Sequence, residues 1–180
     1  MSDKPETPPA GAPGADGGTQ PRPTVPPLQI SAQYIKDLSF ENPHAAQILT
    51  QRSIQPQITV NVDVRTTPLG GNTYEVVLHL RGDAKSGDLQ AFLIELDYGG
   101  IVTIGPEVPK QQAALLLSIE APRMLFPYAR AVVSEATREG GFPPLYVQPI
   151  DFVALFQRQV QALRERIQAG EGEVGTVPLN

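Results

Sequence analysis

Two carboxylates, Glu95 and Asp97, are the residues of this sequence whose types and spacing could do chemistry. Two positions apart on a strand, they would point to the same side with side chains starting about 7 Å apart. That separation suits the carboxylate pair of a glycosidase. A general acid, however, needs a hydrophobic pocket that raises its pKa, and the surrounding residues predict an open, wet surface. We therefore favour a solvated sheet face, and keep a small-molecule enzyme using Glu95 and Asp97 as an alternative hypothesis.

Other reactive or ligating sites have less support. The chain has no cysteine, which excludes disulfides, thiol chemistry and zinc–thiolate sites. Its two histidines, His44 and His79, are far apart in the sequence and have no acidic residues clustered beside them, so we predict no metal site. Gly99, Gly100 and Gly105 lack the spacing of a phosphate-binding loop, and no serine lies in a nucleophile elbow. We predict no catalytic residue and no cofactor.

Composition narrows the class of protein. With 180 residues the chain has room for one domain with a real core. Its formal net charge of −5, without a basic run, argues against nucleic acid and against anionic membrane surfaces as partners. The sequence contains no window of about 18 apolar residues, which is the length needed to span a bilayer. The start, Met1 to Glu6, lacks the apolar segment of a secretory signal. We expect a cytoplasmic protein.

The elements that would position Glu95 and Asp97 are strands. Alternating apolar and polar residues predict strands over 58–66, 73–83 and 89–104, joined by turns short enough for hairpins. A fourth strand is predicted over 28–41. Its buried side would carry, apart from Lys36, the residues Leu28, Ile30, Ala32, Tyr34, Leu38 and Phe40. The same alternation places Asp37, Glu41, Leu93 and Glu95 on the polar face, where Leu93 is a lone apolar residue among carboxylates.

Helical patterns follow the strands. We predict one helix over 113–119, stopped by Pro122, and a second over 122–139 that Pro127 distorts or delays and that Gly140 and Gly141 end. Residues 142–150 contain three prolines and should be extended. Asp151 is a plausible N-cap for a last helix, whose apolar stripe would be Phe152, Phe156, Val160, Leu163 and Ile167. Strands first and helices afterwards predict an α+β fold, a four-stranded antiparallel sheet with helices packed on one face.

The ends of the chain differ from this middle part. Residues 1–27 are crowded with proline, glycine and alanine, so we predict a disordered arm before a domain over 28–169. Residues 170–180 should form a flexible tail. Between the fourth strand and the other three, residues 42–56 make a long excursion with one helical turn near 45–50, and a loop of this length is usually functional.

Eight sequence strings, in order and with near-identical spacing, resemble the SecB family of bacterial protein-export chaperones. The strings are YIKDLSFENP (34–43), QP (55–56), YEVVL (74–78), AFLIEL (91–96), GGI (99–101), LFPYAR (125–130), FP (142–143) and FVALF (152–156). The resemblance runs in order from about Leu28 to Ala169, which is most of the chain. One departure is Ile54, which replaces the tryptophan that the best-known members carry before Gln-Pro.

The resemblance implies a cytoplasmic homotetramer, a dimer of dimers, in which sheets pair across each dimer and helices such as 122–139 pack between the two sheets. It implies an ATP-independent chaperone that holds non-native secretory preproteins and delivers them to the translocase motor SecA. The implied motor contacts are Asp37, Glu41, Leu93 and Glu95. The implied client groove maps to Ile54, Phe92, Tyr128 and Phe156, to which we add Phe40 and Phe142. A SecB-like chaperone of a toxin–antitoxin system is the alternative, and the retained motor contacts favour export.

Overall fold

Short turns force three successive strands into an antiparallel meander. The computed structural model describes residues 25–50 and 56–169, and in it β2 (Gln57–Gly70), β3 (Thr73–Ser86) and β4 (Leu89–Ile104) follow one another. Gly71 and Gly87 lie in the two connections with positive φ of 56° and 61°, which glycine adopts without steric cost. The three predicted strands are confirmed, and β2 and β3 are longer than the alternation indicated.

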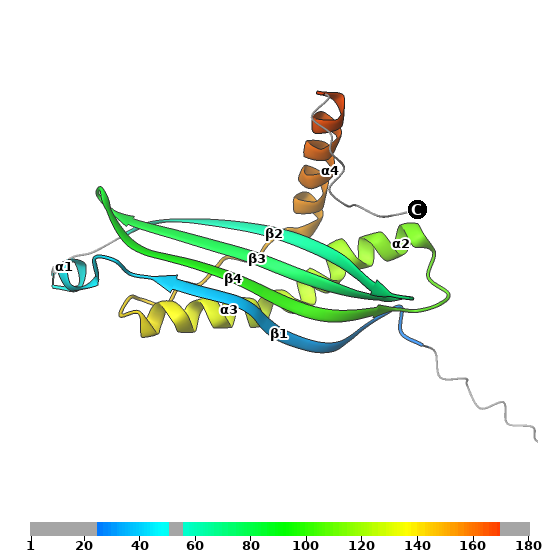
Figure 1. Ribbon diagram of the computed structural model, residues 1–180, viewed down its shortest axis with the longest axis horizontal. Helices are drawn as coiled ribbons and strands as arrows, with labels where there is room; N and C mark the ends of the chain where they lie inside the picture. Colours follow the sequence, from blue (N-terminus) through cyan, green and yellow to red (C-terminus); the bar gives the residue numbers. More distant parts are fainter. Residues whose placement is uncertain (1–24, 51–55, 170–180) are drawn as a thin grey trace, which may run out of the picture.

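The strand β1 (Leu28–Glu41) completes the sheet by pairing with β4, which gives the order β1-β4-β3-β2 (Figure 1). Its register shifts twice, between Ile30 and Ala32 and between Ile35 and Asp37. Each shift inserts an extra residue and moves the following side chains to the other face. The prediction of one uninterrupted alternation along this strand is therefore wrong. Ala32 and Tyr34 lie on the same face as Asp37 and not on the buried side with Leu38 and Phe40.

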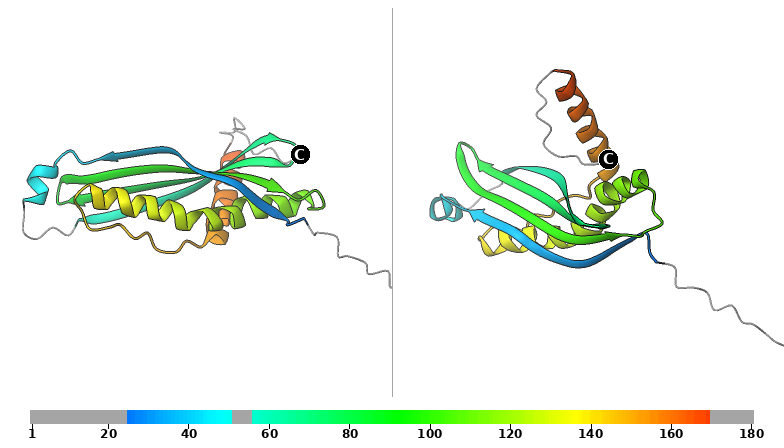
Figure 2. Two further views of the ribbon diagram at one scale, coloured as in Figure 1. Left: turned by 90° about the horizontal axis from the view of Figure 1, so that it is seen from below. Right: turned by 45° about the vertical axis from the view of Figure 1, so that its right-hand side comes forward.

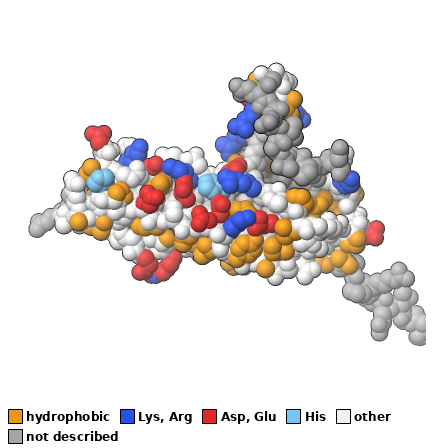
Figure 3. Space-filling view, in the orientation of Figure 1, with side chains coloured by type: hydrophobic (Ala, Val, Ile, Leu, Met, Phe, Trp, Pro, Cys, Tyr) orange, Lys and Arg blue, Asp and Glu red, His pale blue; other side chains and the backbone are white. Residues whose placement is uncertain are grey.

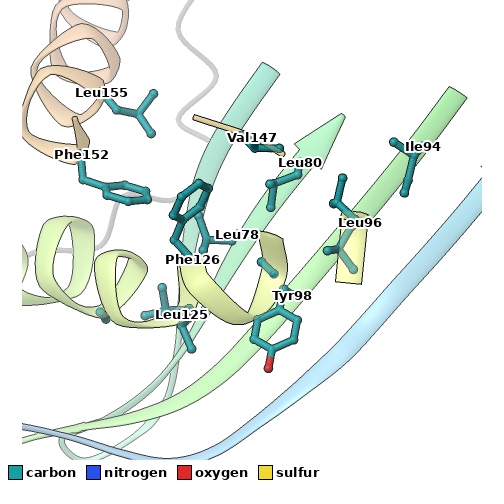
Figure 4. Packing of buried hydrophobic residues seen from close by; sticks show 14 of the residues in the cluster. Leu78, Leu80, Ile94, Leu96, Tyr98, Leu125, Phe126, Val147, Phe152 and Leu155 are labelled. Carbon is teal, nitrogen blue, oxygen red and sulfur yellow. The ribbon is translucent and has the colours of Figure 1, made fainter. Parts of the chain in front are cut away.

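The buried face of the sheet, called here the inner face, carries the core. Its side chains alternate along β3 and β4 as predicted, and they are almost fully shielded from solvent. The set is Val76, Leu78, Leu80, Ala84, Phe92, Ile94, Leu96, Tyr98, Val102 and Ile104. Figure 4 shows part of this layer facing Leu125 and Phe126 of the long helix, with Phe126 edge-on to Phe152 at a ring separation of 5.9 Å. The opposite surface of the sheet, called the outer face, is open to water.

One continuous helical path covers the inner face, although the sequence predicted two separate helices. It comprises α2 (Lys110–Leu115), a wide π-type turn η1 (Leu116–Glu120) and α3 (Ala121–Glu139) (Figure 2). The expectation that Pro122 stops the first helix is wrong. Pro122 lies in the first turn of α3, where a backbone N–H has no partner within the helix, and the preceding turn closes through the Ala121 N–H to the Leu116 carbonyl. Pro127 is accommodated inside α3.

After α3 the chain runs back across the inner face as an extended segment. Gly140 and Gly141 end the helix as predicted, with a φ of 87° at Gly141. Residues 142–150, which we call the strap, form no strand. The predicted N-cap is confirmed, because the Asp151 carboxylate accepts the N–H groups of Val153 and Ala154 at 3.0 Å.

The last helix, α4 (Phe152–Gln168), begins in the core and then leaves the sheet (Figure 1). Phe152 at its start is buried, but Leu163 and Ile167, farther along the predicted apolar stripe, are 42% and 60% exposed. Where α4 passes the edge of the sheet, the Gln159 amide donates to the Asp63 carboxylate of β2 at 2.5 Å. The short helix α1 (Ala45–Leu49) confirms the helical turn predicted after β1, and its Ile48 is completely buried.

Three predictions fall on other parts of the chain. Most of the arm, residues 1–24, and the tail from residue 170 lie outside the described residues. So does Ile54, the one predicted groove residue in the loop before β2.

Candidate functional site

The outer face brings together the four residues predicted to contact a motor. Strand pairing places Asp37 opposite Asp97 and Glu41 opposite Leu93, and Glu95 lies between Leu93 and Asp97 along β4. Residues directly opposite each other on neighbouring strands point to the same side. We call Asp37, Glu41, Leu93, Glu95 and Asp97 the acidic patch, and Figure 3 shows carboxylates and cations intermixed across the middle of this face. The alternation therefore predicted the common face correctly.

Side chains of the patch differ in how their charges are balanced. The Glu95 carboxylate pairs with the Arg81 guanidinium of β3, and the Asp97 carboxylate is 2.6 Å from Nδ1 of His79. Asp37 and Glu41 are exposed, and neither forms an ion pair with another described residue. The β1 side of the patch is therefore the part with uncompensated negative charge. It is free to attract a basic partner segment.

A second cluster lies on the outer face next to the patch, and the shifted register of β1 creates it. The Tyr34 hydroxyl donates to one oxygen of the Glu75 carboxylate at 2.5 Å, and the Lys36 ammonium binds the other at 2.7 Å. The hydrogen bond to Glu75, together with burial, raises the pKa of Tyr34 to about 12. The hydrogen bond from Lys36, and then the one from Tyr34, lower the pKa of Glu75. Sequence reasoning missed this cluster because it placed Tyr34 on the buried side.

The histidine on this face has acidic neighbours that the sequence did not indicate. His79 is flanked by Asp97 on β4 and by Asp63 on β2, which are its direct partners in the two ladders. These residues are 16 to 18 positions away in the chain, so only the strand register could have revealed them. Among residues 25–50 and 56–169, no group of three or more histidine, aspartate or glutamate side chains is arranged to hold a metal ion.

An apolar groove lies on the other side of the sheet, along the edge strand β2. Its floor is Ile58, Val60 and Val62 of β2, and its wall is the strap. The hollow measures ≈ 410 Å³, and Ile58 at its rim is 42% exposed. We call it the strap groove; the strap residues that line it are Leu145, Tyr146, Val147, Gln148, Pro149 and Ile150. Because β2 is at the edge of the sheet, an extended segment could both enter the groove and pair with free backbone groups.

The five predicted groove residues that the structure describes do not form one surface. Phe92 and Phe142 are 1% and 5% exposed and pack against each other with ring centroids 5.0 Å apart, and Phe40 stacks on Phe92 at 5.7 Å. These three rings belong to the core at one end of the sheet. Tyr128 is 55% exposed on α3, and Phe156 of α4 is half-buried against the core.

Sequence reasoning missed the strap groove, although it identified both components. The alternation of Ile58, Val60 and Val62 was evident, and residues 142–150 were predicted to be extended. What the sequence lacked was the strand order, which makes β2 an edge strand with part of its inner face uncovered by α3. No helix in the described part of the chain is long and apolar enough to cross a bilayer.

Comparisons of the sequence with known proteins point to one family. A family model described as preprotein translocase subunit SecB matches residues 21–163. The protein-export protein SecB of Rhodospirillum centenum is 46% identical over 160 residues, which are 89% of this chain and 92% of that protein. The protein of the same description from Hyphomonas neptunium is also 46% identical, over 86% of this chain and 91% of its own length.

A solved structure shares the fold at much lower sequence identity. The SecB-like chaperone Rv1957 of Mycobacterium tuberculosis, in complex with a ChAD peptide from the Rv1956 HigA1 antitoxin, superposes with a TM-score of 0.54. It is 11% identical, and the match covers 69% of this chain and 88% of that one. At that identity the likeness concerns the fold alone.

Proposed function

This chain belongs to the SecB family of protein-export chaperones, and we propose that it holds non-native secretory precursors and delivers them to the SecA motor. The observation that carries the proposal is the presence of two different surfaces on opposite faces of one sheet. The strap groove is apolar and open at a strand edge, whereas the acidic patch is charged and open to water. A delivery chaperone needs both kinds of surface at the same time.

The strap groove suits clients that are extended and apolar. Its floor is a row of side chains at every second residue of β2, which matches the period of apolar residues in an extended client. Folded proteins bury such segments, so a protein that binds them favours non-native chains by mass action and needs no ATP for that step. Phe40, Phe92 and Phe142 pack together in the core. We propose that they support this end of the inner face and do not contact a client in this conformation.

The acidic patch suits the motor. Asp37 and Glu41 present uncompensated carboxylates, Leu93 is a half-buried apolar side chain between them and the sheet centre, and Glu95 completes the set. Charges of this kind accelerate encounter with a basic segment, and an apolar residue among them provides a contact that excludes water.

We further propose a cytoplasmic homotetramer. The strand edge of β1 is free to pair with a second copy, and α3 exposes Met124 and Tyr128 on the side away from its own sheet, where a second sheet could pack. Sedimentation should give a mass near four times 19.4 kDa. A monomer at micromolar concentration would contradict this assembly.

A binding experiment tests the function directly. The purified full chain should bind a reduced, carboxymethylated protein that remains unfolded in buffer, without ATP, and should not bind the same protein in its native, disulfide-bonded form. It should also bind purified SecA while the unfolded protein is bound. Absence of either binding event would contradict the proposal. An antitoxin client is the alternative, and it draws only on the fold likeness to Rv1957.

A further inference from the structure

We propose that Thr137 of α3 positions the strap and so maintains the strap groove in a shape that accepts an extended client. This inference rests on the proposed function, because it assigns a role in client binding to a residue that no client can touch. Thr137 is completely buried. Among the described residues it is the one polar residue that is classed as buried.

The hydroxyl of Thr137 connects the helix to the strap. Its Oγ1 accepts the backbone N–H of Leu145 at 2.9 Å. The hydroxyl proton in turn is donated to the carbonyl of Val133 or Ser134, each at 3.0 Å. Leu145 is a lining residue of the strap groove, so this one side chain joins a carbonyl of α3 to the wall of the groove.

The described strap has few other hydrogen bonds. In the described part of the chain no backbone hydrogen bond joins it to β2, the strand it faces across the groove. At its start the Phe142 N–H donates to the Thr137 carbonyl at 3.2 Å. Farther along, the Arg130 guanidinium of α3 lies 5.7 Å from the centre of the Tyr146 ring, and Tyr146 is largely exposed. Val147 also holds the wall, because its side chain is 6% exposed and belongs to the core, but the Thr137 hydroxyl makes the hydrogen bond to a residue that lines the groove.

The side chain of Leu145 shows why a small shift would matter. A Cβ placed on Gly82 of β3 would lie 3.3 Å from Cδ2 of Leu145, so Leu145 already packs against the sheet backbone. Without the hydroxyl of Thr137, the Leu145 N–H would be left without an acceptor on a half-buried residue, and it would move toward water to find one. That movement would carry the groove wall away from Gly82 and β2.

The test compares Thr137→Val with Thr137→Ser in the full chain. Valine matches threonine in shape but lacks the hydroxyl, whereas serine keeps the hydroxyl. The probe is a fluorescein-labelled peptide of alternating leucine and serine, as long as the strap, and its binding is followed by fluorescence anisotropy. We expect the Kd to rise about tenfold in Thr137→Val, the effect of one lost hydrogen bond, and to stay within about twofold of wild type in Thr137→Ser.

A control separates positioning from simple loss of stability. Val133→Ala truncates a buried side chain of the same helix but keeps the carbonyl that Thr137 binds. It should lower the melting temperature at least as much as Thr137→Val and leave the peptide Kd unchanged, with all titrations well below the onset of unfolding. Hydrogen exchange should show a less protected Leu145 amide in Thr137→Val alone.

Each other outcome overturns the inference. Equal Kd values for Thr137→Val and wild type would show that the groove does not depend on the hydroxyl. An equal loss in Thr137→Ser, or in Val133→Ala, would assign the effect to packing or to stability. Those results would leave the proposed function intact, whereas failure of the wild-type chain to bind the peptide would overturn the groove and this inference together.

Discussion

The two faces of the sheet use the same strands in opposite ways. On β2 the inward residues Ile58, Val60 and Val62 make the floor of the strap groove, and between them Thr59 and Asn61 face the water on the other side. The acidic patch uses the outward residues of β1 and β4 in the same manner. Because alternate residues belong to different surfaces, a single substitution can alter one surface without touching the other. The surfaces proposed for the client and for the motor can therefore be changed separately.

The surfaces also differ in the range of their forces. Carboxylates such as Asp37 and Glu41 act through solvent over about 8 Å at physiological salt. The groove acts only by contact, through removal of apolar area from water. Raising the salt concentration should thus weaken the proposed motor binding and leave client binding nearly unchanged.

A charge placed in the groove should have the largest effect. We expect Ile58→Asp to weaken binding of an unfolded protein by a factor of about thirty, because bound client would remove water from the new carboxylate. Ile58 is 42% exposed, so the folded state should tolerate the change. Thr59→Asp, the neighbouring substitution on the outer face, is the matched control and should leave client affinity unchanged. Fluorescence anisotropy measures both, and equal losses would show that the faces are not independent.

Reversal of a patch charge should come next. We expect Glu95→Lys to weaken SecA binding about tenfold and to reduce its salt dependence, because it removes an attraction and leaves Arg81 without its partner. Leu93→Arg should act in the same direction. Glu139→Lys changes the net charge equally at the far end of α3, where Glu139 is exposed, and should leave motor affinity near the wild-type value. Surface plasmon resonance at two salt concentrations gives the measurement, and client binding should not change in any of these variants.

Loss of the cap at the end of the strap should be smaller. Asp151→Ala removes the acceptor for two backbone N–H groups at the start of α4, and we expect the free energy of unfolding to fall by ~1 kcal/mol. Asp151→Asn should restore most of it. Urea titration followed by circular dichroism measures the difference. An unchanged midpoint in Asp151→Ala would mean that these two hydrogen bonds add nothing to stability.

The smallest effect should be seen at high pH. Glu75 raises the pKa of Tyr34 to about 12, above the value of about 10 for an exposed tyrosine, so folding favours the protonated phenol. The resulting stability is complete below pH 10 and is lost as the pH rises from 10 to 12. Burial also raises the pKa of Tyr98, so ultraviolet absorbance should show late-ionising tyrosines in wild type, and Tyr34→Phe should remove one of them. Titration of that tyrosine near pH 10 would contradict the hydrogen bond.

Period-two alternation predicted much of the fold. It found β2, β3 and β4 because each keeps one phase over most of its length, with register shifts near the strand ends, between Pro68 and Gly70 and between Ala84 and Lys85, and because glycines mark the turns. It was wrong within β1, where two bulges change the phase, since a bulge leaves no signature in residue type. The break predicted at Pro122 was wrong for a related reason. Proline lacks an N–H, and the first turn of α3 does not need one.

The sequence predicted the position of those site residues for which only the face of the strand had to be known. Asp37, Glu41, Leu93 and Glu95 were assigned to one face and lie on it. The His79 neighbours and the Tyr34–Glu75 pair depend on register between strands, and the strap groove depends on strand order. These are long-range relations that a single sequence does not encode locally.

The adjacent glycines of β4 have a consequence of their own. The ring of Tyr34 fills the space beside Gly99 on the outer face, and Leu125 of α3 fills the space beside Gly100 on the inner face. At these two positions only the backbone of β4 separates the outer face from the inner face. Substitutions at the two glycines would therefore affect different faces. Gly99→Ala would displace the ring of Tyr34, whereas Gly100→Ala would displace Leu125 and with it α3. A Cβ would lie 2.7 Å from the Tyr34 ring at Gly99 and 2.8 Å from Leu125 at Gly100, so a larger residue at either position requires that neighbour to move first.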